Sequence, residues 1–380
     1  LASSSLVRRI RGMWDHTESV NSANTNLMCW QNQLFALYEG ATPTRIHMES
    51  LSVDGATDLG VVRRAFSAHP KEIKSQKALF NFGFRILPKP CLDIYKLPFE
   101  GPPELFYSIP FNGSTFVHDF AATEDHLIFP INPVFSNPVD LLVRGRPISE
   151  CLKWQPKSSS EIMVVPIADP TSFFKIQTQA FFYSHTANAF TTAQNQLVFD
   201  GVVYTDGSNI DWINTVYRSC GQVADSYQPG HLQRFTIGLN NKTLHRVAIN
   251  HSAAIEMPQI NPAFSGKAYQ FVYAAGFSQA NSTTAAFYDC LYKLDLKTRN
   301  ATFIDLGDNQ VVNEPLFVPK ENSKQEDSGY LLALHFDSQS KQTYCSIVDV
   351  EASPPQKVAK LSLEAAIPYT FHGLWWPGDP

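Results

Sequence analysis

The sequence lacks long hydrophobic runs, dense basic stretches and paired cysteines. None of its segments approaches the run of about 18 apolar residues that a membrane-spanning helix requires. The net charge is −5, and the single basic run, LVRRIR at residues 6–11, is too short to be a nucleic-acid footprint. These absences argue against a helical membrane protein and against a nucleic-acid partner.

The six cysteines stand singly along the chain, and no CxxC pair occurs. In a chain of 380 residues this pattern indicates reduced thiols in a cytoplasmic protein rather than a disulfide framework. The composition, 44% hydrophobic and 17% charged, is typical of a globular protein with a sizeable core. We therefore expect a single globular domain over residues 1–380.

Amphipathic helical patterns are also scarce, and strand patterns dominate. Short runs rich in β-branched and aromatic residues end at Gly, Pro, Asn or Asp, as in QLFALYEG (33–40), NQLVFDGVVYTDG (195–207) and the hairpin pattern CLYKLDLKTRNATFIDLG (290–307). Such hairpins at near-even spacing indicate a closed all-β array and, for this length, a propeller rather than a sandwich. No WD or kelch signature is present, so the repeats are not visible in the sequence.

Four of the eleven histidines share one setting. A lone histidine is more often a surface residue or a hydrogen-bonded core residue than a ligand. However, four of them stand beside aromatic or small residues in segments poor in charge: His69, His118, His185 and His372. Their spacings correspond to about one, one, and three to four propeller blades of ~40–60 residues. Because the inner strands of all blades point at one axis, four histidines from different blades can converge there.

Four neutral imidazoles suit zinc, copper, iron or nickel, and the lack of thiolates argues against a closed structural zinc site. An octahedral metal with four such ligands keeps positions open for O₂ or a substrate. Because these ligands carry no charge, acidic partners are expected on their second ring nitrogens. Glu39, Glu256 and Glu314 stand at the edges of apolar strands, where a carboxylate needs a partner, although each alone could be a solvated strand end.

Ordered motifs along nearly the whole chain resemble those of the carotenoid cleavage oxygenases. They include LFALYEGATP (34–43), FSAHPK (66–71), FVHDFAATEDHLIF (116–129), FYSHTANAF (182–190), EMPQINP (256–262) and YTFHGLWWP (369–377). The resemblance implies an all-β, seven-bladed β-propeller with a loop and helix cap over an axial Fe(2+), held by His69, His118, His185 and His372. It pairs Glu39 with His118, Glu256 with His185 and Glu314 with His372, and it leaves His69 without a carboxylate.

The family normally has further chain upstream, so we expect that the N-terminal part of the family fold is absent here and that the given sequence begins late. Thr25 matches the family threonine whose methyl group shields one position of the metal. Tyr38, Phe116 and Ser184 match positions that line the substrate tunnel near the metal. Phe116 alone could equally be a residue of the strand core.

The resemblance implies an enzyme that uses O₂ to cleave a conjugated C=C bond of a carotenoid or apocarotenoid. Stilbene cleavage is an alternative, but stilbene-cleaving members carry a lysine before the first glutamate, where this chain has Tyr38. Ester isomerohydrolysis, known from the retinoid branch, and a non-enzymatic propeller scaffold are further alternatives; a scaffold predicts the loss of a ligand, and none is lost. Because carotenoids dissolve in bilayers, we expect peripheral membrane contact. The sequence leaves the cleavage position, the polyene length and the oligomeric state open.

Overall fold

The structure is a computed structural model that describes residues 21–85, 89–111, 115–136, 151–210, 228–249, 252–278 and 287–376. In these ranges most regular elements are β-strands, residues 208–210 are α-helical, and three short 3₁₀ helices are present: η1 (Lys74–Gln76), η2 (Pro170–Ser172) and η3 (Pro262–Phe264). Within the same ranges, no helix has the length and apolar character needed to cross a membrane. The chain divides into two compact units, Leu1–Phe120 with Glu124–Ala180 (unit 1) and Ala121–Thr123 with Phe181–Pro380 (unit 2).

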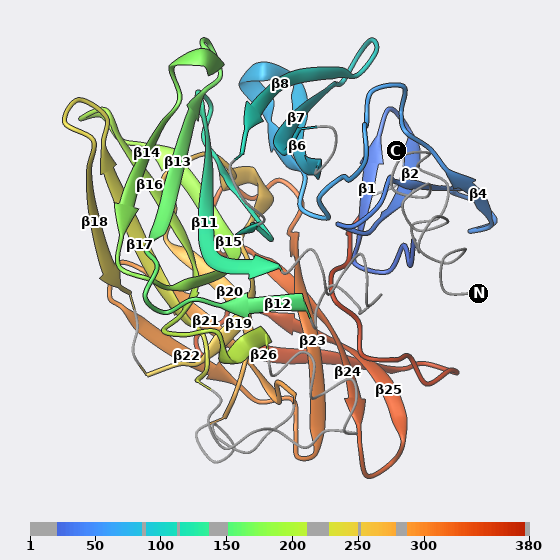
Figure 1. Ribbon diagram of the computed structural model, residues 1–380. Helices are drawn as coiled ribbons and strands as arrows, with labels where there is room; N and C mark the ends of the chain where they lie inside the picture. The colour runs from blue at the N-terminus through green and yellow to red at the C-terminus, as the bar shows by residue number, and fades with distance from the viewer. Residues whose placement is uncertain are drawn as a thin grey trace. The chain divides into compact units, whose positions relative to one another are not determined.

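Unit 1 contains three antiparallel sheets (Figure 1). The first runs in the order β1 (Asn26–Trp30), β2 (Gln33–Leu37), β3 (Thr44–Ile46), β4 (Val53–Ala56). The second runs in the order β5 (Lys71–Ile73), β6 (Ala78–Arg85), β7 (Cys91–Pro98), β8 (Glu104–Pro110). In the third, β11 (His126–Ser136) pairs with β9 (Thr115–Phe116), β12 (Leu152–Trp154) and β13 (Ser160–Pro166), and β13 pairs with β14 (Phe174–Thr178).

Unit 2 contains the short strand β10 (Ala121–Ala122) and three four-stranded antiparallel meanders. The first is β15 (Phe182–Thr191), β16 (Gln196–Tyr204), β17 (His231–Gly238), β18 (Thr243–Ala248). The second is β19 (Ile255–Gln259), β20 (Phe271–Gly276), β21 (Cys290–Asp295), β22 (Asn300–Ile304). The third is β23 (Gln310–Pro319), β24 (Gly329–Asp337), β25 (Gln342–Asp349), β26 (Gln356–Ser362).

The described residues form six sheets, so the prediction of seven blades is wrong for this part of the chain. A blade is one meander of about four strands, and the described ranges supply strands for six of them. The predicted cap of loops and helices is likewise not seen in the ranges that the structure describes. The all-β content is as predicted, and the hairpin expected at residues 290–307 is confirmed as β21 and β22, with Leu291 opposite Ile304.

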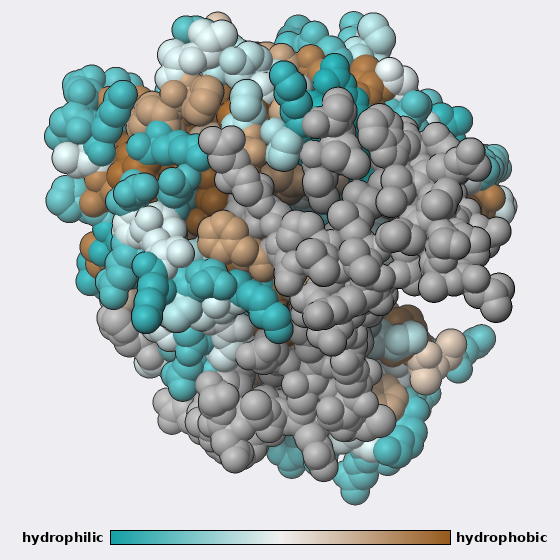
Figure 2. All heavy atoms as spheres, in the orientation of Figure 1, coloured by the Kyte–Doolittle hydropathy of each residue, from teal (hydrophilic) through white to brown (hydrophobic). Residues whose placement is uncertain are grey.

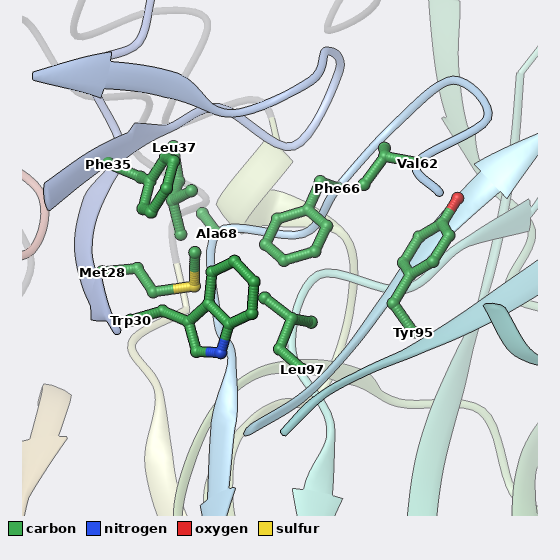
Figure 3. Close-up of a cluster of buried hydrophobic side chains, with 9 residues drawn as sticks. All are labelled: Met28, Trp30, Phe35, Leu37, Val62, Phe66, Ala68, Tyr95 and Leu97. Atoms are coloured by element: carbon green, nitrogen blue, oxygen red, sulfur yellow. The ribbon is translucent and has the colours of Figure 1, made fainter. Parts of the chain in front are cut away.

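Apolar side chains are mostly inside. On the face shown in Figure 2, the described surface is largely hydrophilic, with small groups of apolar residues between the polar ones. In unit 1, one cluster of buried side chains joins the first sheet to the second and to residues 61–70 (Figure 3). Its members are Met28, Trp30, Phe35, Leu37, Val62, Phe66, Ala68, Tyr95 and Leu97.

The Figure 3 cluster anchors the irregular segment 61–70, which carries no strand of its own. Full burial of a phenylalanine such as Phe66 contributes about 1.5–3 kcal/mol. The Trp30 indole N–H donates to the Pro98 carbonyl at 2.7 Å, so the largest ring of the cluster also has its polar atom paired. The segment before residue 69 is therefore held by packing.

Candidate metal centre

His69 in unit 1 ends a short stretch that is hydrogen-bonded beside strand β6. The Ser67 N–H donates to the Phe82 carbonyl at 2.7 Å, and the Asn81 side-chain amide donates to the Ser67 carbonyl at 2.7 Å. The His69 N–H donates to the Ser67 hydroxyl at 3.2 Å. His69 is 6% exposed, so its imidazole is held in a buried place by its neighbours in the chain.

The close approach of this stretch to β6 depends on Gly83. A Cβ atom at that position would lie 1.7 Å from the Ala65 carbonyl oxygen, so any other residue would clash with the backbone there. Glycine therefore lets two backbones meet where any other residue would push them apart. Phe66 and Ala68, which belong to the Figure 3 cluster, hold the same stretch from its apolar side.

His118, the other candidate metal-binding histidine of unit 1, follows strand β9. Its Nδ1 lies 2.8 Å from Glu39 Oε2, and its Nε2 lies 3.1 Å from His69 Nε2. The two imidazole rings meet edge to face with their centroids 4.6 Å apart, and the Phe116 ring stacks on His118 at 6.0 Å. A histidine is tolerated in this aromatic segment because both of its ring nitrogens have polar neighbours.

The neighbouring Asp119 has a structural role in the same turn. Its carboxylate, 2% exposed, accepts the Phe120 N–H at 2.7 Å and lies 2.8 Å from Lys71 Nζ. Asp119 therefore caps the backbone and pairs a buried charge.

In unit 2, His185 stands in a β-bulge of β15. The pairing of β15 with β16 shifts register between Tyr183 and Thr186. A bulge inserts one extra residue into a strand and re-aims its side chains. His185 Nδ1 lies 2.6 Å from Glu256 Oε2, and the residue is 9% exposed.

Glu256 is enclosed by hydrogen-bond donors. Its Oε1 accepts the Tyr204 hydroxyl at 2.7 Å, and its Oε2 also accepts the Met257 N–H at 2.8 Å. Burial by itself raises the pKa of this carboxyl, but the positive charge of His185 when that ring is protonated, with the hydrogen bonds of His185, Ser184 and Met257, lowers the pKa to about 2. Glu256 is therefore an ionised carboxylate at neutral pH.

His372 and Glu314 form the third pair, also within unit 2. His372 Nδ1 lies 2.8 Å from Glu314 Oε1, and the Gly373 N–H donates to Glu314 Oε2 at 2.9 Å. The pairing of β23 with β24 shifts register between Val312 and Pro315, which brackets Glu314. The rings of His372 and His185 meet edge to face with their centroids 4.8 Å apart.

The three carboxylates decide which nitrogen of each partner imidazole carries hydrogen. An ionised carboxylate only accepts, so Nδ1 of His118, His185 and His372 is the donor, and Nε2 keeps its lone pair in the neutral ring. A lone pair on one nitrogen with a carboxylate on the other is the usual arrangement of metal-binding histidine. In each unit the ring nitrogens fit a metal ion: His69 lies beside His118 in unit 1, and His185 lies beside His372 in unit 2.

The residues predicted to shield the metal or line the tunnel lie beside these pairs in the chain. Thr25 precedes β1, and its N–H donates at 2.9 Å to the carbonyl of Leu37, which stands two residues before Glu39. Tyr38 is half-buried, and burial together with the Glu39 charge raises the pKa of its phenol. Ser184 is 2% exposed and precedes His185. Their contacts with a substrate, like those of Phe116, stay predictions.

Two polar side chains that touch the carboxylates were not predicted from the sequence. Tyr204 donates to Glu256, and the Gln259 side-chain amide donates to Glu314 Oε1 at 2.7 Å. Gln259 belongs to the motif EMPQINP, which begins with Glu256, so its nearness in the sequence to that proposed site residue could have indicated a role in the site. Tyr204 ends an apolar strand run, where an aromatic residue usually is core, and it gave no such signal.

The described sheets are antiparallel meanders, and three histidines are hydrogen-bonded to glutamates in the way typical of metal ligands. These features define the class of the protein: an all-β protein with histidines suited to bind a metal. The model of the family described as retinal pigment epithelial membrane protein matches residues 3–377. The chain belongs to this family, that of the carotenoid cleavage oxygenases, as its motifs predicted.

Three known relatives show how far the likeness extends. The chain is 30% identical to apocarotenoid-15,15'-oxygenase of Synechocystis sp., over 93% of this chain and 73% of the relative. It is 24% identical to the chloroplastic 9-cis-epoxycarotenoid dioxygenase NCED6 of Arabidopsis thaliana, over 96% of this chain but only 61% of the relative. It is 23% identical to resveratrol cleavage oxygenase 1 of Aspergillus fumigatus, over 94% of this chain and 74% of the relative.

A solved relative supports the predicted propeller fold. The crystal structure of cobalt-substituted Synechocystis ACO matches with a TM-score of 0.83 and 28% identity, over 95% of this chain and 75% of that chain. The all-β propeller prediction is therefore confirmed at the level of the fold class.

Proposed function

We propose that this chain is a non-haem iron dioxygenase that cleaves a conjugated C=C bond of a carotenoid or apocarotenoid with O₂, giving aldehyde or ketone products. The observation that carries the proposal is the set of three Nδ1–carboxylate hydrogen bonds. They leave the lone pairs on Nε2 of His118, His185 and His372 available to bind a metal. The substrate class is supported by the relatives, which include an apocarotenoid oxygenase and an epoxycarotenoid dioxygenase.

The two histidine pairs are proposed to hold one Fe(2+) together, so that both units belong to a single domain over residues 1–380. Four neutral imidazoles leave the charge of the ion uncompensated in its first shell. Glu39, Glu256 and Glu314 supply that negative charge one hydrogen bond further out and hold the rings in place. Bound iron supplies the one-electron chemistry that lets O₂ react with a polyene.

The other residues serve the substrate in this proposal. Thr25 shields one side of the metal, while Tyr38, Phe116 and Ser184 line the tunnel next to the imidazoles. The stacking of Phe116 on His118 supports an aromatic wall there. Holding one double bond of a long polyene in register and excluding water are the main tasks left to the protein.

Stilbene cleavage is the second candidate, because a resveratrol cleavage oxygenase matches 94% of this chain. Stilbene-cleaving members of the family place a lysine before the first glutamate to grip the substrate phenol. Tyr38 occupies that position here and offers no ammonium group. The carotenoid proposal is therefore preferred, and a scaffold without activity is disfavoured because all three histidine–glutamate pairs are intact.

We further propose that the protein is cytoplasmic and takes its substrate from a membrane surface as a peripheral protein. Three apolar residues that are between 38% and 46% exposed follow His372 after one glycine: Leu374, Trp375 and Trp376. Indole rings favour the interface between water and lipid. Flotation with liposomes tests this: recovery only in the soluble fraction, with unimpaired cleavage of membrane-dissolved substrate, contradicts it.

The activity is tested with iron-loaded protein, β-apo-carotenals and stilbenes, and mass analysis of the aldehydes. Carotenal products are expected, and His185→Ala should lose bound iron and activity together. His245→Ala is the matched control because this exposed histidine lies on β18. Full activity of a zinc-loaded enzyme would contradict the redox mechanism, and cleavage of stilbenes alone would favour the second candidate.

A further inference from the structure

Strand β19 carries polar groups for two different histidine–glutamate pairs of unit 2. Its pairing with β20 shifts register between Glu256 and Gln259. Within this bulge Met257 has a φ of 53°, an uncommon conformation for a residue with a side chain. In a regular strand, residues three apart point to opposite faces. The extra residue of a bulge removes that constraint, so Glu256 and Gln259 can both serve one site.

One hydrogen-bonded arm runs from Tyr204 through Glu256 to His185. The tyrosine hydroxyl donates to Glu256 Oε1 at 2.7 Å, and Oε2 of the same carboxylate lies 2.6 Å from His185 Nδ1. Tyr204 is 0% exposed, so solvent does not compensate if its hydroxyl is removed. One of the donors that orient this carboxylate therefore lies beyond it as seen from the imidazole.

The other arm runs from Gln259 through Glu314 to His372. Gln259 Nε2 lies 2.7 Å from Glu314 Oε1, the same oxygen that is 2.8 Å from His372 Nδ1. The second carboxylate oxygen accepts the Gly373 N–H at 2.9 Å. Both oxygens are therefore engaged, and three donors fix the plane of the carboxylate: His372, Gly373 and the side-chain amide of Gln259.

We propose that Tyr204 and Gln259 are positioning residues for the metal site, acting through Glu256 and Glu314. The inference rests on the proposed metal-binding function. Loss of either donor lets a carboxylate turn, and the imidazole bonded to it then turns about its own side-chain axis. A small turn displaces Nε2, the atom farthest from the backbone, and so loosens the metal. The outer hydrogen bonds of a metal site typically change affinity by about 10–100-fold.

The test uses two variants that remove one donor each and keep the volume, Tyr204→Phe and Gln259→Met. Each has a matched control in unit 2. Tyr292→Phe removes a buried tyrosine hydroxyl that donates to a backbone carbonyl at 3.1 Å. Gln270→Met removes a side-chain amide that donates to a carboxylate at 3.0 Å.

The metal-free full chain is titrated with Co²⁺ in competition with a chelator, and the visible spectrum of the complex is recorded. Cobalt is the probe because its absorption reports ligand geometry, and a cobalt-substituted relative has been solved. We expect each test variant to bind cobalt at least about tenfold more weakly than wild type, with a shifted spectrum. The controls should keep wild-type affinity and spectrum even where their melting temperatures fall.

Wild-type affinity and spectrum in both test variants would overturn the inference. Equal weakening in the test variants and their controls would do the same, since it would show a merely structural effect. If wild type itself binds neither cobalt nor iron, the proposed function fails instead. Circular dichroism of the metal-free protein shows whether a variant folds, and if one does not, the other decides.

Discussion

Acidification is expected to destabilise the last sheet of unit 2, because strand β24 buries a neutral histidine there. His335 is 0% exposed. Its Nδ1 donates to Gln310 Oε1 at 2.5 Å, because an amide oxygen only accepts. Its Nε2 therefore accepts the Ser346 hydroxyl at 2.8 Å. This network is satisfied by the neutral ring, and a proton on Nε2 places a charge among buried partners.

The size of the effect follows from the pKa of this imidazole. Burial is the largest cause that lowers the pKa of His335 from 6.5 to about 4; Lys360 and Lys357 lower it further, and Asp337 opposes them. Between these two values the unfolded chain binds a proton that the folded chain does not. The free energy of unfolding therefore falls as the pH falls below 6.5. At 1.36 kcal/mol for each pH unit, the loss approaches about 3 kcal/mol near pH 4.

The assay is urea unfolding of the metal-free protein at several pH values between about 7.5 and 4.5, for wild type and His335→Gln. Glutamine keeps a donor and an acceptor but binds no proton in this range. We expect wild type to lose about 2–3 kcal/mol more than the variant over this interval. His245→Gln, at an exposed position on β18, should follow wild type. Parallel profiles for wild type and His335→Gln would refute the reasoning.

Three other perturbations test the site and its support. Glu256→Gln should weaken metal binding by about 10–100-fold in a chelator competition, and wild-type affinity would contradict the role of its bond to His185. Gly83→Ala must open a gap of 1.7 Å to at least 3.0 Å against the Ala65 carbonyl, so we expect a melting temperature several degrees lower; an unchanged value would show that residues 61–70 yield at no cost. Chelation of the metal should lower the melting temperature, and added iron should raise it again with the logarithm of the free metal concentration.

Strands and hairpins could be predicted from the sequence because their signals are local. In residues 290–307, alternating apolar positions and a polar turn contain the whole hairpin, and Leu291 lies opposite Ile304 as such a pattern requires. The number of sheets is a different kind of quantity. It depends on which meanders pair with which, and no repeat in the sequence marks where one sheet ends and the next begins.

The histidines of the site could be selected from their setting, but their partners could not be derived in that way. The three histidine–glutamate pairs join residues 79, 71 and 58 positions apart. Contacts of that range follow from the fold, and only the family resemblance supplied them. Tyr204 was missed for a related reason, since a tyrosine in an apolar strand has the same local pattern whether its hydroxyl meets a backbone carbonyl or a carboxylate.

The site of unit 2 is built where the strand pattern breaks. His185, Glu256 and Glu314 all lie at register shifts, each in the first strand of its sheet. Such a break leaves ladder groups unpaired, and a buried carboxylate has a further desolvation cost. A regular apolar strand would be at least as stable as a strand with such a break and a buried carboxylate. The hydrogen bonds from imidazole, hydroxyl and backbone therefore only offset the desolvation cost of the carboxylate. Each of these three breaks places a histidine or its carboxylate, and together they supply the polar groups that the proposed metal site needs.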